Sequence, residues 1–360
     1  MAADLPGDRE SHHRGVATAI SVTARNRTRR WARQGAITTV LAGVLLSTLT
    51  VLLALPTWLQ FLPFAISVVV LGLPHGAVDH LVIPRAHGER PNLRSMLAVG
   101  LLYLIVGGAY TVVWLLAPAL AFAGFILVTA LHWGQGDVYA LRVIEGATHL
   151  EGGLNRLGTL AVRGAIPMLV PLVAYPAEYE RVAAAIVGLV DPDAMATLEP
   201  AFTTGGRLAV AVGLGTVILV TLALGFVRAG GDRGSWLVDA GETVGLVAYF
   251  VLVPPILAIG IYFCFWHSLR HVLRTMLLDP ITRGALESGH GRGAWRRFAR
   301  DAAPLTLGGV AVIGLLALAL PRAPGSLEET LGLYLIAIAV MTLPHVVVVS
   351  ILDRIEGVWS

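Results

Sequence analysis

Six histidines lie inside apolar stretches of this chain, where an ionisable side chain is costly and usually marks a site. They are His75 and His80 in LGLPHGAVDHLVI, His132 in ALHWGQGD, His267 and His271 in FWHSLRHV, and His345 in LPHVV. Neutral imidazole is a ligand for zinc, copper, iron and nickel. The residue types therefore predict a transition-metal centre inside an apolar protein.

The local spacing indicates which side chains act together. His267 and His271 are four residues apart, so on a helix they share a face and both can bind one ion. His75 and His80 are five apart, about 140° around a helix, which argues against both binding the same ion. Asp79 shares the face of His75, and we expect its carboxylate to support that imidazole from behind.

The composition shows what kind of element must carry these histidines. Of the 360 residues, 56% are hydrophobic and only 14% are charged, against about 25% charged in a soluble domain. Runs of about 20 apolar residues have the length of a transmembrane helix. The sequence predicts an all-α, polytopic helical bundle with spans at 36–55, 61–83, 95–117, 119–138, 158–175, 206–228, 240–253, 255–278, 303–320 and 329–352.

The seventh and eighth spans are divided at Pro254-Pro255. One helix over 240–278 would be about 58 Å long, while a hydrocarbon core holds about 30 Å. With this division, nearly all arginines fall on the cytoplasmic side and only Arg181 and Arg322 on the other. We expect both termini in the cytoplasm, a disordered Arg-rich tail over 1–35, and a single transmembrane catalytic domain over 36–360.

All the intramembrane histidines then fall at one depth. Their four spans run in the same direction, and each histidine lies in the cytoplasmic half. We expect one polar centre where these spans converge, and solvated positions for the other histidines, including His149. The aromatic side chains near the site, such as Phe122, Phe125 and Phe263, are expected to pack or face lipid.

Alternatives remain at this point. A haem or quinone redox protein would use paired axial histidines, and a metal or proton transporter would use their titration. Transport sites usually add intramembrane carboxylates, and Asp79 is the only deep one that the pattern shows. The single cysteine excludes an intrachain disulfide, and the absence of lysine excludes a retinal Schiff base in this chain. The formal charge of +3 gives no indication of nucleic-acid binding.

The motifs PHGAVDH, ALHWGQGD, FWHSLRHV and LPHVV, in this order, resemble the Brp/Blh family of membrane β-carotene 15,15'-dioxygenases. The resemblance covers most of the chain from about residue 60 onward. It implies a non-haem Fe(II) enzyme of the cell membrane that cleaves the central double bond of β-carotene with O2. The product is two molecules of all-trans-retinal, which supply a retinal-binding rhodopsin as functional partner.

The resemblance also implies roles for individual residues. The iron ligands of the family correspond to His75, His132, His267 and His271. Further positions are expected around the ligands or in the wall of the cavity, namely Asp79, His80, His345 and Asp137. The substrate would enter sideways from the lipid into an apolar tunnel that passes the metal.

Overall fold

In the computed structural model, which describes residues 20–231, 233–321 and 324–359, all regular structure is helical and no strand occurs. Within these residues, ten helices are long and apolar enough to cross a membrane. They are Val22–Leu52, Trp58–Ala86, Leu93–Leu116, Pro118–Glu145, Gly153–Ala174, Thr204–Ala229, Gly234–Leu252, Pro255–Leu278, Gly291–Ala319 and Leu327–Ile355. The predicted all-α bundle of ten spans is confirmed.

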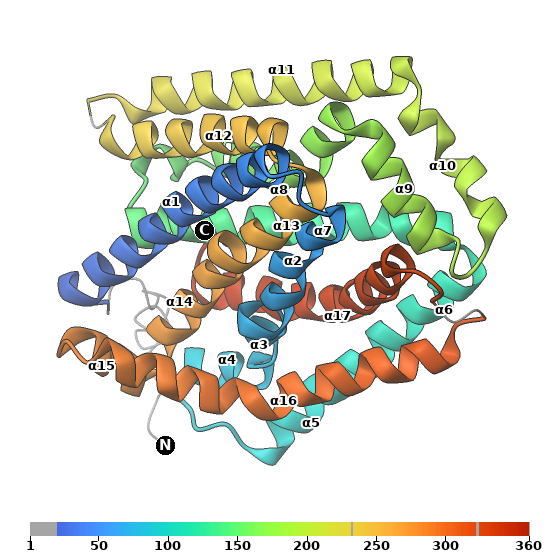
Figure 1. Cartoon of the computed structure of the whole chain (residues 1–360). Helices are drawn as coiled ribbons and strands as arrows, with labels where there is room; N and C mark the ends of the chain where they lie inside the picture. The colour runs from blue at the N-terminus through green and yellow to red at the C-terminus, as the bar shows by residue number, and fades with distance from the viewer. Residues whose placement is uncertain (1–19, 232, 322–323, 360) are drawn as a thin grey trace, which may run out of the picture.

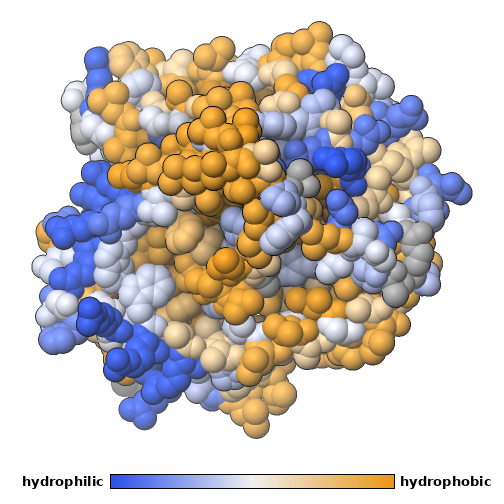
Figure 2. All heavy atoms as spheres, in the orientation of Figure 1, coloured by the Kyte–Doolittle hydropathy of each residue, from blue (hydrophilic) through white to orange (hydrophobic). Residues whose placement is uncertain are grey.

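The outer surface exposes many large apolar side chains. Leu116, Val227 and Leu318 are each at least 75% exposed, and many other large apolar side chains are also exposed. Figure 2 shows hydrophilic side chains at the left edge and at the right of the view, with a mostly hydrophobic region between them. A soluble protein rarely exposes so large an apolar surface. The chain is a polytopic helical membrane protein.

The first span begins earlier than predicted. Helix α1 (Val22–Leu52) includes residues that we expected in a disordered tail over 1–35. Arg29 donates to the carbonyl of Ile144 at 3.1 Å, and Arg33 forms a two-point hydrogen bond with Glu145 at 2.6 and 3.0 Å. These contacts hold the Arg-rich turns on the protein, so the disordered interpretation is wrong from Val22 onward. Residues 1–19 of the expected tail, and Arg322, lie outside the described residues.

The chain breaks at the two prolines as predicted. Helix α12 (Gly234–Leu252) ends two residues before Pro254, and α13 (Pro255–Tyr262) starts with a proline in its first turn. Proline has no N–H to continue the preceding helix and suits the first helical position. The eighth span continues from α13 through η8 (Phe263–Ser268) and α14 (Leu269–Leu278). It runs through the middle of the bundle in Figure 1 and is the most enclosed of the ten spans.

Close helix packing places the fourth and fifth spans against each other. A Cβ on Gly164 of α8 (Gly153–Ala174) would lie 1.8 Å from the carbonyl oxygen of Ala130 on α7 (Pro118–Tyr139). A Cβ on Gly134 would lie 2.2 Å from the carbonyl oxygen of Leu160. Small residues of this kind let transmembrane backbones approach each other closely.

Four π-helical turns interrupt the spans that surround the centre of the protein. In the described residues they are η3 (Val68–Gly72), η4 (Tyr103–Gly107), η5 (Ala140–Glu145) and η8. Such turns are frequent at functional sites, because the extra residue rotates the side chains that follow. All four lie in the second, third, fourth and eighth spans.

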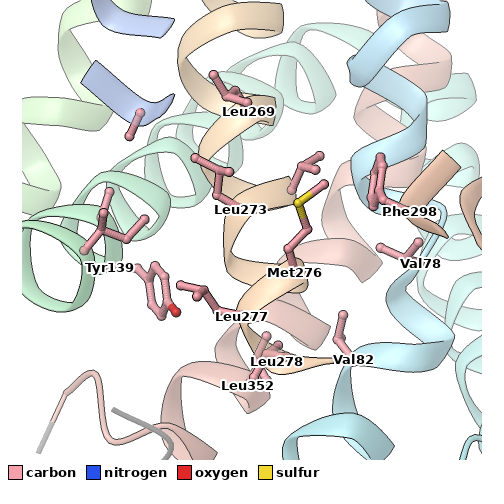
Figure 3. Close-up of a cluster of buried hydrophobic side chains, with 14 of the residues drawn as sticks. Val78, Val82, Tyr139, Leu269, Leu273, Met276, Leu277, Leu278, Phe298 and Leu352 are labelled. Atoms are coloured by element: carbon pink, nitrogen blue, oxygen red, sulfur yellow. The ribbon is translucent and has the colours of Figure 1, made fainter. Parts of the chain in front are cut away.

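A cluster of buried apolar side chains anchors α14. Figure 3 shows Leu269, Leu273, Met276 and Leu277 of this helix facing side chains from several other spans. Those neighbours include Val78, Val82, Tyr139, Phe298 and Leu352. In a membrane such a cluster stabilises the fold through dense packing, since lipid tails are as apolar as these side chains. The cluster therefore fixes the position of the helix that carries His271.

The loop between the eighth and ninth spans is held by ion pairs. Asp279 caps α15 (Pro280–Glu287), accepts from Arg297 Nε at 2.7 Å, and lies 3.6 Å from Arg85 Nε. Burial on its own raises the pKa of the Asp279 carboxyl, but the hydrogen bond from Arg297 and the charge of Arg85 outweigh it. The pKa is therefore held below its usual value of 3.8.

Candidate metal centre

Five imidazoles from four spans meet at the centre of the bundle. Each belongs to a residue that is at most 9% exposed. His75 lies on α3 (Leu73–Gly76), His132 on α7, His267 on η8, His271 on α14 and His345 on α17 (Leu327–Ile355). The structure thus brings together the four histidines expected as ligands, with His345 as a fifth member.

His132 stands in the middle of this group. Its ring centroid lies 4.6 Å from that of His267, 4.7 Å from that of His271 and 4.6 Å from that of His345. The Nε2 atoms of His132 and His267 are 3.0 Å apart. The His75 ring lies 5.1 Å from His345 and 5.3 Å from His267. Rings this close around His132 leave no room for a porphyrin plane, which argues against the haem alternative.

The donor atoms form two overlapping groups that could hold an ion. His75, His132 and His345 make one group, and His132, His267 and His271 make the other, each with its donor atoms within 4.8 Å of one another. Two nitrogens that each lie about 2.0–2.1 Å from one metal ion are at most about 4.2 Å apart, so the donor atoms of each group are close to the spacing that one ion requires. The geometry of both groups therefore fits a metal centre.

Several nitrogens of this cluster have no hydrogen-bond partner among the described residues. They are Nδ1 of His132, Nε2 of His271 and Nε2 of His345, all buried. A buried polar atom without a partner costs about 1–3 kcal/mol, and a bound cation would remove this cost for a nitrogen that faces it. Imidazole-only donors suit iron as well as zinc, copper and nickel.

Asp79 has a different partner from the one expected. Its Oδ2 lies 2.7 Å from Nδ1 of His345 and accepts a hydrogen bond from the Tyr103 hydroxyl at 2.6 Å. Nδ1 of His75 instead lies 3.3 Å from the Leu71 carbonyl oxygen. Residues four apart share a face only on a continuous helix, but α3 ends at Gly76 and a new helix, α4 (Asp79–Ala86), begins at Asp79. This break turns the carboxylate away from His75.

An apolar cavity of about 500 Å³ lies against one side of the cluster. His75, His132 and His345 form part of its wall, whereas His267 and His271 do not. His80 also lines it, outside the ring cluster, with a buried Nδ1 that has no partner among the described residues. Most of the wall is apolar and includes Phe64, Phe122, Phe125, Tyr179 and Phe263. Phe122, Phe125 and Phe263 pack in buried apolar clusters, as expected, and they also line this cavity, which was not expected.

Asp137 belongs to a buried ionic network instead of contacting an imidazole. It accepts hydrogen bonds from Arg270 at 2.8 Å and from the Trp266 indole at 3.1 Å. Arg270 also binds Glu242 at 2.6 Å. Because Trp266 and Arg270 flank His267 in the chain, the network fixes the backbone that carries two of the histidines.

The network extends to a second buried arginine. Arg163 is fully buried and pairs with Asp239 at 2.9 Å and Glu242 at 3.0 Å. His149 lies 3.0 Å from Asp239 and is 2% exposed, so the solvated position expected for it is wrong. Asp79 is also not the only deep carboxylate, since Asp137 and Asp239 are buried too. The arginine partners of these carboxylates lie far away in the sequence, so the pairs could not be predicted from local spacing.

Comparison with known proteins identifies the family. A family model described as β-carotene 15,15'-dioxygenase matches residues 66–353. The probable β-carotene 15,15'-dioxygenase Blh of Halobacterium salinarum is 41% identical over 83% of this chain and 86% of its own length. The probable enzyme Brp of the same organism is 30% identical over 85% of this chain and 87% of its own.

A third relative is more distant. The β-carotene 15,15'-dioxygenase of an uncultured marine bacterium is 24% identical over 57% of this chain and 65% of its own length. No solved structure matches the chain. The family match includes all five clustered histidines, and with the two Halobacterium relatives it shows that the chain belongs to the β-carotene 15,15'-dioxygenase family.

Proposed function

We propose that this protein cleaves the central 15,15' double bond of β-carotene with O2 and releases two molecules of all-trans-retinal. Family membership supports the reaction. One observation carries the proposal for this chain: three clustered imidazoles form part of the wall of an otherwise apolar cavity. A hydrocarbon in that cavity would lie directly beside the candidate metal centre.

Fe(II) is the proposed cofactor, with His75, His132, His267 and His271 as the residues that hold it. The donor set and the buried, unpartnered nitrogens support a cation at this place. Bound there, iron would supply the activation of O2 and the oxidation of the alkene. The protein contributes the position of the substrate and the exclusion of water, because the imidazoles are buried and the cavity beside them is mostly apolar.

The shape of the cavity would select the bond that is cleaved. A carotene enters this cavity from lipid and not from water. Apolar burial alone therefore does little to fix which bond of the polyene lies beside the histidines. Its volume of about 500 Å³ falls in the range of ligand sites. Aromatic side chains such as Phe122, Phe125 and Phe263 would fix the polyene chain so that its central bond faces the histidines.

We propose that the protein resides in the cell membrane with both termini in the cytoplasm. The concentration of arginines on the loops of one side supports this orientation. Retinal formed in the bilayer would supply a retinal-binding rhodopsin there. This chain cannot itself bind retinal as a Schiff base, because it has no lysine.

The test is retinal formation in carotene-accumulating cells that express the protein. We expect retinal with the intact chain, none with His267→Ala, and normal output with His290→Ala, which changes an exposed histidine outside the spans. Undiminished β-carotene with folded, iron-loaded protein would refute the proposed substrate. Normal output from His267→Ala would refute the proposed metal site.

A further inference from the structure

His345 occupies a place in the cluster that the sequence did not assign to it. Its imidazole is 6% exposed and lies 4.6 Å from the ring of His132 and 5.1 Å from the ring of His75. Its donor atom belongs with theirs to a group compact enough to hold an ion. A residue that only lined the cavity would not need this position between two ligand candidates.

The hydrogen bonds of His345 fix its tautomer. Nδ1 lies 2.7 Å from Oδ2 of Asp79, and a carboxylate accepts hydrogen bonds, so Nδ1 carries the proton. In the neutral ring, Nε2 then holds the free lone pair. This Nε2 is buried and has no hydrogen-bond partner among the described residues. A buried imidazole with a carboxylate on one nitrogen and an unused lone pair on the other is typical of a metal-binding histidine.

Tyr103 completes this arrangement from the third span. Its hydroxyl donates to the same Oδ2 of Asp79 at 2.6 Å, and both Asp79 and His345 are buried. Because Tyr103 and His345 both donate to this oxygen, the Asp79 carboxylate cannot rotate freely. The carboxylate in turn holds the His345 ring in one orientation. Tyr103 lies on the π-helical turn η4, which interrupts an otherwise α-helical, apolar span.

We propose that His345 is a further ligand of the metal ion, on the side of the cavity, and that Asp79 and Tyr103 are positioning residues for its imidazole. This inference rests on the proposed iron site. His75, His132 and His345 line the cavity while His267 and His271 do not. His345 would thus bind the ion on the face past which the substrate lies, and Asp79 would increase the basicity of its Nε2.

The experiment measures metal binding by the full-length protein in lipid nanodiscs. Metal-free protein is titrated with Fe(II) under anaerobic conditions, and with Co(II), whose visible absorption reports the number and type of ligands. Loss of a carboxylate or hydroxyl that holds a metal ligand in place by hydrogen bonding typically weakens metal binding by about 10–100-fold. We expect Asp79→Asn and Tyr103→Phe to fall in this range and His345→Ala to exceed it. We also expect an altered Co(II) spectrum for His345→Ala, and recovery of that spectrum with added imidazole.

His80→Ala is the matched control for metal binding. His80 lies on the same span as His75, is equally buried and has an unpartnered Nδ1, but its ring is outside the cluster. Its Fe(II) affinity should equal that of the unchanged protein. His345→Gln, which keeps most of the side-chain volume, and thermal unfolding of the metal-free variants show whether a loss of binding reflects a loss of fold.

The outcomes separate this inference from the proposed reaction. An Fe(II) affinity of His345→Ala within twofold of the unchanged protein, with the same Co(II) spectrum, would overturn the inference and leave the reaction standing. Failure of the unchanged protein to bind either metal would also overturn it. If the unchanged protein binds Fe(II), His345→Ala does not, and β-carotene is still not cleaved, the ligand assignment holds and the proposed substrate is wrong.

Discussion

Gly136 is the position where a single methyl group should test the metal centre most directly. It lies on α7, one helical turn after His132. A Cβ at this position would lie 2.6 Å from Nε2 and 3.2 Å from Cδ2 of His271. We expect Gly136→Ala to displace the His271 imidazole and to weaken Fe(II) binding while the bundle stays folded.

The size of the displacement follows from the contact distances. Ordinary contact begins at 3.4 Å, so His271 Nε2 must move by about 0.8 Å from its position 2.6 Å from the new methyl group. Metal–ligand distances tolerate deviations of about 0.2 Å. The ring cannot simply swing aside, because the rings of His132 and His267 each lie 4.7 Å from it. A loss of at least about tenfold in Fe(II) affinity is expected, comparable to the loss of a group behind a ligand.

The assay is anaerobic Fe(II) titration of the purified protein, with thermal unfolding of the metal-free form as a second measurement. Gly124→Ala is the control, since it lies on the same helix and its Cβ would meet only the Tyr110 side chain, at 3.3 Å or more. It should bind Fe(II) normally, with the small gain in helix stability of about 0.5–1 kcal/mol that replacing glycine gives. Unchanged Fe(II) affinity in Gly136→Ala would refute the placement of His271 against α7.

Other expectations concern the scaffold. Gly164→Val should prevent close packing of α7 and α8, because even its Cβ would lie 1.8 Å from the Ala130 carbonyl oxygen. The yield of monodisperse protein should therefore fall sharply. Gly213→Ala is the control, since its Cβ would meet no atom within 4 Å, and this variant should express normally. Arg163→Met should lower the free energy of unfolding by about 3–5 kcal/mol, since it removes the arginine that pairs with the buried carboxylate of Asp239. An unchanged free energy of unfolding in detergent would contradict this. The lowered pKa of Asp279 means that its carboxylate stabilises the fold fully above pH 3.8 and that this contribution is lost as pH falls through the folded pKa. The difference in free energy of unfolding between the unchanged protein and Asp279→Asn should therefore become smaller in acid. A difference that grows in acid would contradict the lowered pKa.

The membrane architecture could be predicted because it depends on local properties. Apolar length identified the spans, and the two adjacent prolines separated the seventh from the eighth. The start of α1 could not be found in this way. Arg29 and Arg33 look like solvated tail residues until Glu145, more than a hundred positions later, is placed beside them.

The centre was predictable in its members but not in its internal contacts. A common depth and helical spacing brought out His267 and His271 as one face. The partner of Asp79 was missed because the helix ends between His75 and Asp79. Tyr103 carried no signal, since a lone tyrosine in an apolar span is usually a packing residue. The π-helical turns also change which side chains share a face, and a regular helical period cannot show this.

The buried arginine of α8 has a consequence for how the chain enters the membrane during synthesis. A lone arginine within a transmembrane helix costs about 2.5–3.5 kcal/mol at the translocon. Asp239 and Glu242, its close partners, are synthesised more than seventy residues later. Asp137 on α7 already exists at that moment, and its carboxylate lies 3.6 Å from the Arg163 guanidinium. Because the glycine contacts pack α7 against α8, we expect these two helices to enter the bilayer as a pair, so that Arg163 has a counter-charge before the later helices arrive.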